Sequence, residues 1–192
     1  MRLVFALRNA FDRSMAARII RLGTSLGDAD AIADLHTRSR RVAYRGLYGD
    51  HYLDHELAAV SRAVWRRRFE TYAPAQDLIL AAMESGEPVG LAYASFRGNP
   101  DVGLLVDNLH VAPERKGQGL GSRLLATVAR WLVDEHAGAP LHLEVYAPNQ
   151  DALGFYARKG GIEAARYRET PPGGHDVEVV RFMWSKPKEL LP

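Results

Sequence analysis

The sequence contains no cysteine among its 192 residues, and it has no long apolar run. The lack of cysteine excludes disulfide bonds, thiolate metal ligands and a cysteine nucleophile. No stretch approaches the roughly 18–20 apolar residues that a helix needs to cross a bilayer. The apolar stretch 3–7 is too short for the core of a signal peptide, and Arg8 follows it directly. These absences predict a folded cytoplasmic protein.

Lysine is scarce and the net charge is small. Only four of the 25 basic residues are lysines, and the net charge is +2 although the isoelectric point is about 9.0. A charge this low does not indicate a nucleic-acid or membrane partner. The run Trp65-Arg66-Arg67-Arg68 is the densest basic segment. Its three arginines point in three directions around a helix, which predicts a solvated face.

The composition, with 47% hydrophobic and 25% charged residues, is that of an ordinary globular protein. We expect residues 1–16 to form a flexible N-terminal extension and residues 17–186 to form a single domain. Hydrophobic periodicity predicts the following segments. The strands are 18–22, 77–83, 89–96, 102–111, 141–146, 163–169 and 177–185, and the helices are 28–38, 54–72, 120–136 and 149–159. This order predicts a mixed α/β fold.

Two details of the helices are expected from local pattern. Asp28 should cap the first helix, and the second should bury a stripe formed by Leu57, Val60, Val64 and Phe69. Between them, residues 44–52 are rich in tyrosine and glycine, which predicts a loop or a broken helix.

A glycine-rich turn between a predicted strand and a predicted helix is the most informative segment. Gly117, Gly119 and Gly121 alternate there. Glycine lets the backbone approach a ligand closely, and the N–H groups at a helix N-terminus carry partial positive charge. The turn therefore predicts a phosphate or pyrophosphate site. A P-loop is excluded because no lysine follows Gly121, and a dinucleotide fingerprint fails because Ser122 stands at its last position.

The same turn resembles the acetyl-CoA pyrophosphate loop of the GNAT superfamily of N-acetyltransferases. In that family a strand ending in V-x-P precedes a basic residue or Gln, two residues, Gly, one residue, and Gly or Ala. Here Val111-Ala112-Pro113 and Lys116-Gly117-Gln118-Gly119-Leu120-Gly121 occupy those places. Taken alone, the segment could also be a plain glycine-rich surface turn. Lys116 departs from the commoner Arg or Gln, which keeps a charge but not a bidentate fork.

A second motif makes the resemblance specific. Residues 149–160, NQDALGFYARKG, are similar to the family element N-x-x-A-x-x-F-Y-x-x-x-G at every fixed position. Asn149 can cap this helix, Ala152, Phe155 and Tyr156 fall on one face, and Gly160 can end it. The resemblance covers residues 17–185 in element order and 102–161 in motif detail.

The resemblance implies a GNAT fold with a central, mostly antiparallel sheet of about seven strands, splayed between strands 4 and 5 and flanked by about four helices. It implies an enzyme that transfers an acetyl group from acetyl-CoA, its co-substrate, to an amine by direct attack. The acceptor would be an amine on a small molecule or a peptide, and the protein a monomer or homodimer. The alternative is a non-catalytic acyl-CoA-binding or regulatory protein on the same fold.

The matching positions imply a set of cofactor-binding residues. Pantetheine would lie like an added strand along the predicted strand that ends near residue 111, and the glycine-rich turn would hold the pyrophosphate. The set is Leu109, His110, Val111, Lys116, Gly117, Gln118, Gly119, Leu120, Gly121, Ser122 and Asn149. Asn149 would either bind pantetheine or serve only as a helix cap. Arg115, Lys116 and Arg123 are the candidates for the adenosine phosphates.

Two catalytic residues follow from the same comparison. Tyr156 matches the family tyrosine that protonates the departing thiolate, a role that suits a phenol because it is protonated at neutral pH. The alternative for Tyr156 is a core aromatic residue. Asp107 is the candidate base, with Glu144 on the neighbouring strand as its competitor, and the alternative for Asp107 is a surface carboxylate with no catalytic role. Strand alternation would place Asp107 on the same face as Leu109 and Val111, together with Leu105.

The remaining expectations concern the acceptor site, metal binding and one departure from the motif. The resemblance implies that residues 41–52 and the loop 171–176 wall the acceptor site, which makes Tyr44, Tyr48 and His175 candidates; the alternative is that they are ordinary loop residues. His51 and His55 have the spacing of a zinc pair, but no H-E-x-x-H accompanies them, so no metal site is expected. Gly161 stands where the family usually has an aromatic residue, and we expect weaker packing under the last hairpin.

Overall fold

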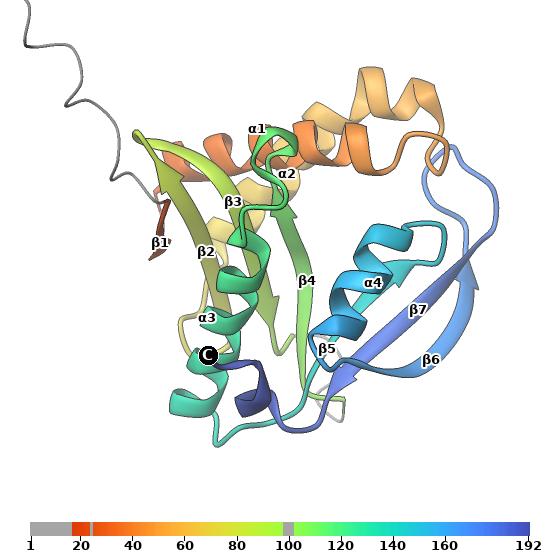
Figure 1. Cartoon of the computed structure of the whole chain (residues 1–192). Helices are drawn as coiled ribbons and strands as arrows, with labels where there is room; N and C mark the ends of the chain where they lie inside the picture. Colours follow the sequence, from red (N-terminus) through yellow and green to blue (C-terminus); the bar gives the residue numbers. More distant parts are fainter. Residues whose placement is uncertain (1–16, 24, 98–101) are drawn as a thin grey trace, which may run out of the picture.

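The structure is a computed structural model that describes residues 17–23, 25–97 and 102–192. The extension expected over residues 1–16 lies outside these ranges. The described residues form one seven-stranded sheet with the strand order β1-β2-β3-β4-β5-β7-β6 (Figure 1). Its strands are β1 Arg18–Arg21, β2 Asp77–Glu84, β3 Glu87–Ser95, β4 Leu104–Val111, β5 Leu141–Tyr146, β6 Ile162–Glu169 and β7 Val177–Trp184. All seven coincide with predicted strands to within two residues at each end, and β5 has the predicted bounds.

The sheet splits between β4 and β5. Every other neighbouring pair is antiparallel, whereas β4 and β5 are parallel and pair only at Leu104↔Leu141 and Leu105↔His142. Beyond these two positions the strands diverge, and Figure 1 shows the resulting V between them. The splayed, mostly antiparallel sheet expected from the sequence is confirmed.

Gly103 stands at the apex of the V. Its φ is +101°, and a Cβ there would lie 2.2 Å from the carbonyl oxygen of Pro140. The next N–H, that of Leu104, donates to the same oxygen at 2.9 Å. Only glycine fits this approach, so the narrow end of the V depends on it.

Helices cover both faces of the sheet (Figure 1). On one face lie α1 Leu26–Ala43 and α2 Leu57–Glu70, and on the other lie α3 Leu120–Glu135 and α4 Gln150–Arg158. Strand β2 shows why both layers are needed, because its residues are buried on both sides. Leu78 and Leu80 join the core under α3, whereas Ile79 and Ala81 join the core under α1 and α2. None of the described helices is both long and apolar enough to span a membrane.

Two local predictions about the first helices are wrong. Helix α1 begins at Leu26 with Ser25 as its N-cap, so Asp28 lies in the first turn and the helix runs five residues beyond the predicted end. The buried stripe of α2 is Leu57, Ser61, Trp65 and Phe69, while Val60 and Val64 are each 40% exposed. The predicted stripe mixed two faces, since a spacing of four residues from Leu57 selects Ser61 and Trp65 instead.

The start of the second helix also differs. A short π-helix, Tyr52–Glu56, precedes α2 and buries Leu53 completely. Tyr52, its first residue, is partly buried and packs against Tyr48, with the ring centroids 5.8 Å apart. Residues 44–51 before it contain turns, as expected, and an isolated bridge between Arg45 and Tyr48.

The expected packing defect at Gly161 is absent. A Cβ at Gly161 would lie 2.7 Å from Trp184 Cζ2 and 3.0 Å from Phe182 Cδ1. Trp184 fills the space that an aromatic residue at this position would take, and its Nε1 donates to the Lys159 carbonyl at 2.8 Å. The core under the last hairpin is therefore closed from β7 rather than from the end of α4.

Candidate active site at the splayed strands

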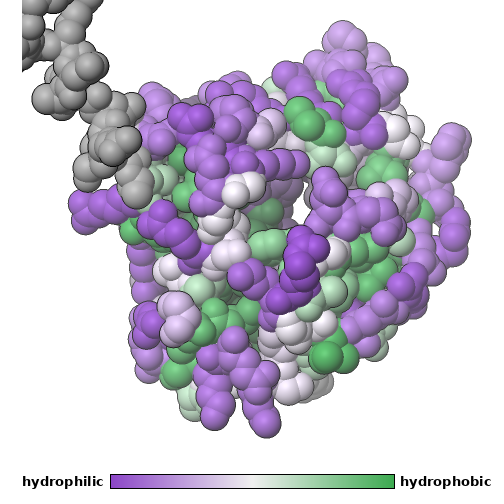
Figure 2. All heavy atoms as spheres, viewed as in Figure 1, coloured by the Kyte–Doolittle hydropathy of each residue, from purple (hydrophilic) through white to green (hydrophobic). Residues whose placement is uncertain are grey.

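A cavity of about 510 Å³ opens between the diverging strands on the side of α3 and α4. Figure 2 shows this face of the molecule, hollowed between its two halves and bordered by hydrophilic side chains. Eleven of the thirteen predicted site residues line the cavity: Asp107, Leu109, His110, Val111, Lys116, Gly117, Gly119, Leu120, Gly121, Asn149 and Tyr156. Gln118 and Ser122 are not among its lining residues.

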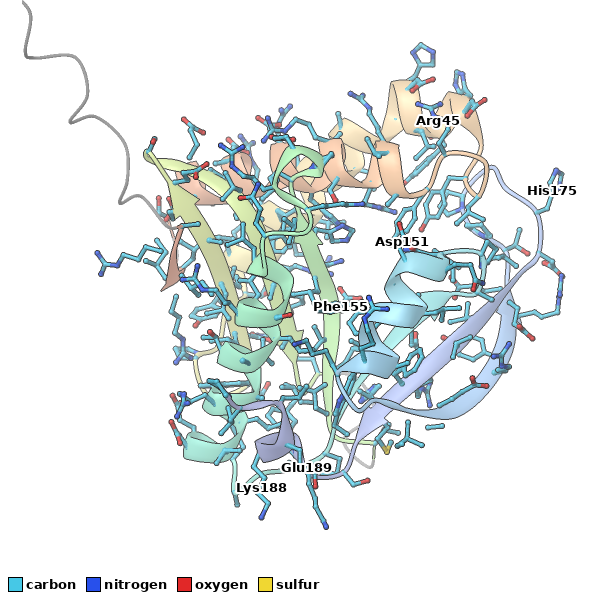
Figure 3. The ribbon with its side chains drawn as sticks, viewed as in Figure 1. Arg45, Asp151, Phe155, His175, Lys188 and Glu189 are labelled. Atoms are coloured by element: carbon cyan, nitrogen blue, oxygen red, sulfur yellow. The ribbon has the colours of Figure 1, made fainter. Side chains whose placement is uncertain are left out.

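The glycine-rich turn forms one end of this cavity. Gly117 and Gly119 have φ values of +77° and +78°, and Gly119 is the left-handed N-cap of α3. No atom lies within 4 Å of a Cβ built on either glycine, so the turn is open beside both residues, and neither N–H donates to a backbone carbonyl among the turn and loop contacts of the described residues. Gly121 faces the opposite wall, where Phe155 Cζ is 3.6 Å from its built Cβ. Figure 3 shows Phe155 projecting from α4 into the space between α3 and α4.

The basic residues around the turn are placed unequally. Lys116 lines the cavity and is exposed. Arg115 also lines it, but its guanidinium forms an ion pair with Glu84 at 2.7 Å. Arg123 is exposed and lies outside the lining, whereas Arg158, which the motif comparison did not single out, contributes to it from the last turn of α4. The local positive charge is therefore carried by Lys116 and Arg158, with Arg115 already partnered.

The second motif builds the opposite wall. Asn149 is the N-cap of α4, and its Oδ1 accepts the N–H of Ala152 at 3.3 Å, as its position predicts. Gly160, with a φ of +76°, follows the end of the helix. Tyr156 is 8% exposed, packs against the core of the sheet and lines the cavity. Burial, with a smaller effect from Tyr44, raises the pKa of the Tyr156 phenol above its ordinary value, so this hydroxyl keeps its proton.

A second cavity of about 440 Å³ lies on the other side of the sheet, toward α1 and α2. Five residues line both cavities: Tyr44, Asp107, Glu144, Val145 and Tyr146. The gap between β4 and β5 thus joins the two spaces. Two ligands that enter from opposite faces would meet between the strands, next to two carboxylates.

Asp107 reaches this junction through a bulge. The register of β3 and β4 shifts so that Tyr93 pairs with Asn108 while Ala94 pairs with Val106, which leaves Asp107 without a partner on β3. As a result Val106, Leu109 and Val111 pack into the core under α3, and Asp107 points to α2. The predicted alternation of Leu105, Asp107, Leu109 and Val111 on one face is therefore wrong.

Arg68 of α2 holds the bulge. Its two terminal nitrogens donate to Asp107 Oδ2 and to Asn108 Oδ1. The guanidinium also packs over the ring of Tyr93, 4.2 Å from the centroid. The solvated face predicted for the arginine run holds for Arg66 and Arg67, but Arg68 points inward and lines the second cavity.

A hydrogen-bonded chain crosses the second cavity. Arg40 Nη2 donates to Tyr48 Oη at 3.2 Å, Tyr48 and Tyr146 share a hydrogen bond of 3.0 Å, and Tyr146 donates to Glu169 Oε1 at 2.6 Å. Because each phenol has one proton, Tyr48 must donate to Tyr146. Burial, and then the bonds to Glu169 and Tyr48, raise the pKa of Tyr146. The chain links α1 to β5 and β6, and motif spacing does not reveal it.

Two histidines lie next to each other beside β4: His36 of α1 is buried, and His110 of β4 is partly buried. His36 Nδ1 accepts the indole N–H of Trp65 at 2.9 Å, and His110 Nδ1 lies 3.0 Å from Ser39 Oγ. Burial lowers the pKa of both, followed by the nearby positive charges, and that of His110 falls to about 3. Both rings are neutral at physiological pH, so they contribute hydrogen bonds and packing rather than charge.

The acceptor-site candidates separate into two groups. Tyr44 and Tyr48 line the second cavity, together with Tyr52. His175 does not, and Figure 3 shows it projecting outward from the loop between β6 and β7. That loop nevertheless contacts the segment 44–52, because Gly49 N–H donates to the Pro172 carbonyl at 3.2 Å. The rings of His51 and His55 lie 4.9 Å apart, but within the described ranges no three metal-binding side chains gather.

The first cavity fits an acyl-CoA. Its open glycine turn at a helix N-terminus suits a pyrophosphate, Lys116 and Arg158 supply positive charge, and the free edge of β4 beyond Leu105 can pair with an extended chain. The polar groups of β4 that face the gap would otherwise lack partners, which is a second reason for a strand-like ligand there.

Comparison with known proteins agrees with this geometry. Among solved structures, the PaiA N-acetyltransferase from Thermoplasma acidophilum in complex with coenzyme A has a TM-score of 0.67 and 16% identity, covering 87% of this chain and 99% of its own. The ribosomal-protein-alanine N-acetyltransferase from Brucella melitensis has a TM-score of 0.64 and 16% identity, with 88% and 99% covered. The protein yncA from Salmonella typhimurium, solved with acetyl-CoA, has a TM-score of 0.64 and 14% identity, with 88% and 94% covered.

These identities show a shared fold and no more. A search of curated protein sequences found no match. The sequence itself, however, matches the profile of the Acetyltransferase (GNAT) family over residues 31–161, about two thirds of the chain, including the glycine-rich turn and the helix that carries Tyr156. The chain therefore belongs to the GNAT family of acetyltransferases.

Proposed function

We propose that this protein transfers an acetyl group from acetyl-CoA to a primary amine by direct attack of the amine. The observation that carries the proposal is the junction of the two cavities between β4 and β5. Tyr156 lines the first cavity only, while Asp107 and Glu144 line both. A proton donor is thus available on the thioester side, and proton acceptors stand where the amine would enter.

Acetyl-CoA would supply the activated acyl group and would lie in the first cavity. The backbone of the glycine-rich turn would bind its pyrophosphate, and Leu109 to Val111 on β4 would pair with the pantetheine arm. A backbone N–H of β4 would polarise the acetyl carbonyl. The amine nitrogen then forms a bond to the acetyl carbon and the carbon–sulfur bond breaks. The amine proton passes to a carboxylate, and the departing sulfur takes the proton of Tyr156.

Asp107 is the base that we favour over Glu144. Arg68 holds Asp107 through Oδ2, and Oδ1 makes no hydrogen bond within the described part of the chain, so its lone pairs are free. Glu144 accepts two bonds from Arg181, at 2.8 and 3.1 Å, both on Oε1. The bulge turns Asp107 out of the ladder, and bulges commonly re-aim a side chain beside an active site.

The test of the function is an acetyl-CoA assay over a broad amine library, read by release of free thiol and by mass spectrometry of the product. We expect at least one amine to be acetylated, and Tyr156→Phe to lower its kcat by about 100-fold. Gly119→Val should abolish CoA binding, because its side chain would occupy the open turn. Gly138→Val is the matched control, since Gly138 also has a positive φ and open surroundings but lies beyond the end of α3.

The assignment of the base has its own test. Asp107→Asn should lower kcat/KM by about 100-fold, whereas Arg68→Met, which breaks the same ion pair but keeps the carboxylate, should have a smaller effect. A larger loss in Glu144→Gln would transfer the role to Glu144. A protein that binds CoA tightly yet acetylates no amine would favour the non-catalytic alternative.

A further inference from the structure

Arg40 is a cation in the second cavity, and it has no role in the proposed acetyl transfer. It lies on α1 and lines the second cavity but not the first, so it does not face the CoA side. Its guanidinium packs over the rings of Tyr44 and Tyr48, at 5.6 and 5.2 Å from their centroids, and one nitrogen donates to Tyr48 Oη. No carboxylate among the described residues pairs with it. Since a guanidinium has five N–H donors, most of them remain available to a ligand.

Apart from Glu169, the other charged side chains of this cavity that belong to strands or to α2 are already in ion pairs. Arg68 is paired with Asp107, Glu144 with Arg181 outside the cavity, and Glu169 accepts a tyrosine hydroxyl. A polyamine would need several free carboxylates, and the cavity does not offer them. The cavity offers a polyamine only Glu169, whereas Arg40, a partly buried cation without an ion-pair partner among the described residues, favours an acceptor that carries one anionic group.

An apolar wall faces the same cavity from α2. Val60 and Val64 lie one helical turn apart and line the cavity. Each is 40% exposed, so their apolar side chains are available to a ligand. Ser61 stands beside them with 1% of its surface exposed, and its Oγ has no hydrogen-bond partner within the described residues. That oxygen is closed off from the cavity, so the two valines set the apolar character of this wall.

The walls of the cavity are held in place. The backbones of the segment around Gly49 and of the β6–β7 loop are in direct contact, because a Cβ on Gly49 would lie 2.4 Å from Gly173 O and one on Gly174 would lie 2.3 Å from Leu47 O. The tyrosines of this segment, including Tyr48, are therefore preorganised around Arg40. A fixed cavity of about 440 Å³ is of the size that holds a small molecule.

We propose that the amine acceptor is an α-amino acid with an apolar side chain, whose carboxylate is bound by Arg40. This inference rests on the proposed function. The amino group lies at the junction with Asp107 and Glu144, and the side chain packs on Val60 and Val64. Transfer gives the N-acetyl amino acid and free CoA, with the amine proton leaving on the carboxylate at the junction and the sulfur protonated by Tyr156.

The test compares acceptors that differ only in the anionic group: L-phenylalanine, L-phenylalaninamide and phenethylamine, and the corresponding three compounds of L-leucine. We expect kcat/KM for the free amino acid to exceed that of its amide and its amine by about 10- to 100-fold, the usual value of a charged hydrogen bond. Arg40→Met should remove this preference and Arg40→Lys should retain part of it. Arg38→Met, an exposed change on the same helix, should keep the preference intact.

A second readout does not depend on turnover. L-phenylalanine and its amide are titrated by calorimetry into the protein saturated with CoA, for the wild type and for Arg40→Met. If no amine is acetylated but L-phenylalanine binds through Arg40, the proposed catalysis fails and the binding inference stands. If amines are acetylated without preference for a carboxylate, the function stands and the inference is overturned.

Three further results would overturn the inference. Equal use of the amide by the wild type would point to a peptide N-terminus as acceptor. Spermidine as the best acceptor would show that the cavity selects polycations. A preference for the free amino acid that survives in Arg40→Met would show that another group binds the carboxylate.

Discussion

Replacing Gly103 with alanine should destabilise the protein at the apex of the V between β4 and β5. The φ of +101° is strained for any residue with a side chain, at about 1–2 kcal/mol. The added Cβ would also lie 2.2 Å from Pro140 O, which belongs to the backbone and cannot move as a side-chain tip would. Relief of such overpacking costs about 1–3 kcal/mol. The sum is about 2–5 kcal/mol, or a fall in Tm of roughly 4–20 °C for a chain of this size.

Gly86→Ala provides the matched control. Gly86 has a φ of +87° in the turn between β2 and β3, and no atom lies within 4 Å of a Cβ built there. This variant should carry the conformational strain alone, at about 1–2 kcal/mol. The difference between the two variants isolates the clash with Pro140. Urea unfolding followed by circular dichroism measures both free energies of unfolding.

The same substitution tests how the active site is held open. Only two residue pairs join β4 to β5, so a displaced apex must alter the gap between them. We expect Gly103→Ala to weaken CoA binding at temperatures where the variant is still folded, and Gly86→Ala to leave it unchanged. The reasoning is refuted if the free energies of unfolding of the two variants agree within about 0.5 kcal/mol, which is the usual size of the effect of a neutral surface substitution.

Three further predictions concern the site. Asn149→Ala removes the cap bond to Ala152 and should cost about 1 kcal/mol in thermal unfolding; a larger loss in CoA affinity by calorimetry would assign Asn149 a ligand contact as well. Because burial raises the pKa of Tyr156, ionisation of the phenol should lower the wild-type kcat only above the ordinary tyrosine range of about pH 10. A fall in kcat at lower pH that disappears in Tyr156→Phe would contradict this. The pKa of His110 is lowered to about 3, so between about pH 6.5 and 3 the unfolded chain binds a proton there and the native state does not, and stability is lost as the pH falls through that range. His110→Gln should therefore flatten the slope of the unfolding free energy against pH by up to about 1.4 kcal/mol per pH unit. An unchanged slope would refute the assignment.

The sequence by itself determined the elements and the two motifs, because these depend on neighbours in the chain. The glycines at 117, 119 and 160 adopt the positive φ that their positions require, and Asn149 caps its helix as its spacing indicates. The cavity-lining positions near the turn follow from the same local pattern. The bounds of β5 also follow from short-range periodicity.

Only the tertiary structure decided what faces the junction of the two cavities. The bulge at Asp107 depends on the register of β3 against β4, and a one-residue shift reverses the face of every residue after it. Arg68 is turned inward because Asp107 and Asn108 lie opposite α2, although the arginine run alone indicates a solvated face. Arg40, Tyr48, Tyr146 and Glu169 come from four separate segments, and their hydrogen-bonded chain exists only because the splayed sheet brings those segments together. Contacts between distant segments leave no local pattern in the sequence, so the chemistry that depends on them cannot be predicted from it. A turn that binds an anion through its own backbone does leave such a pattern.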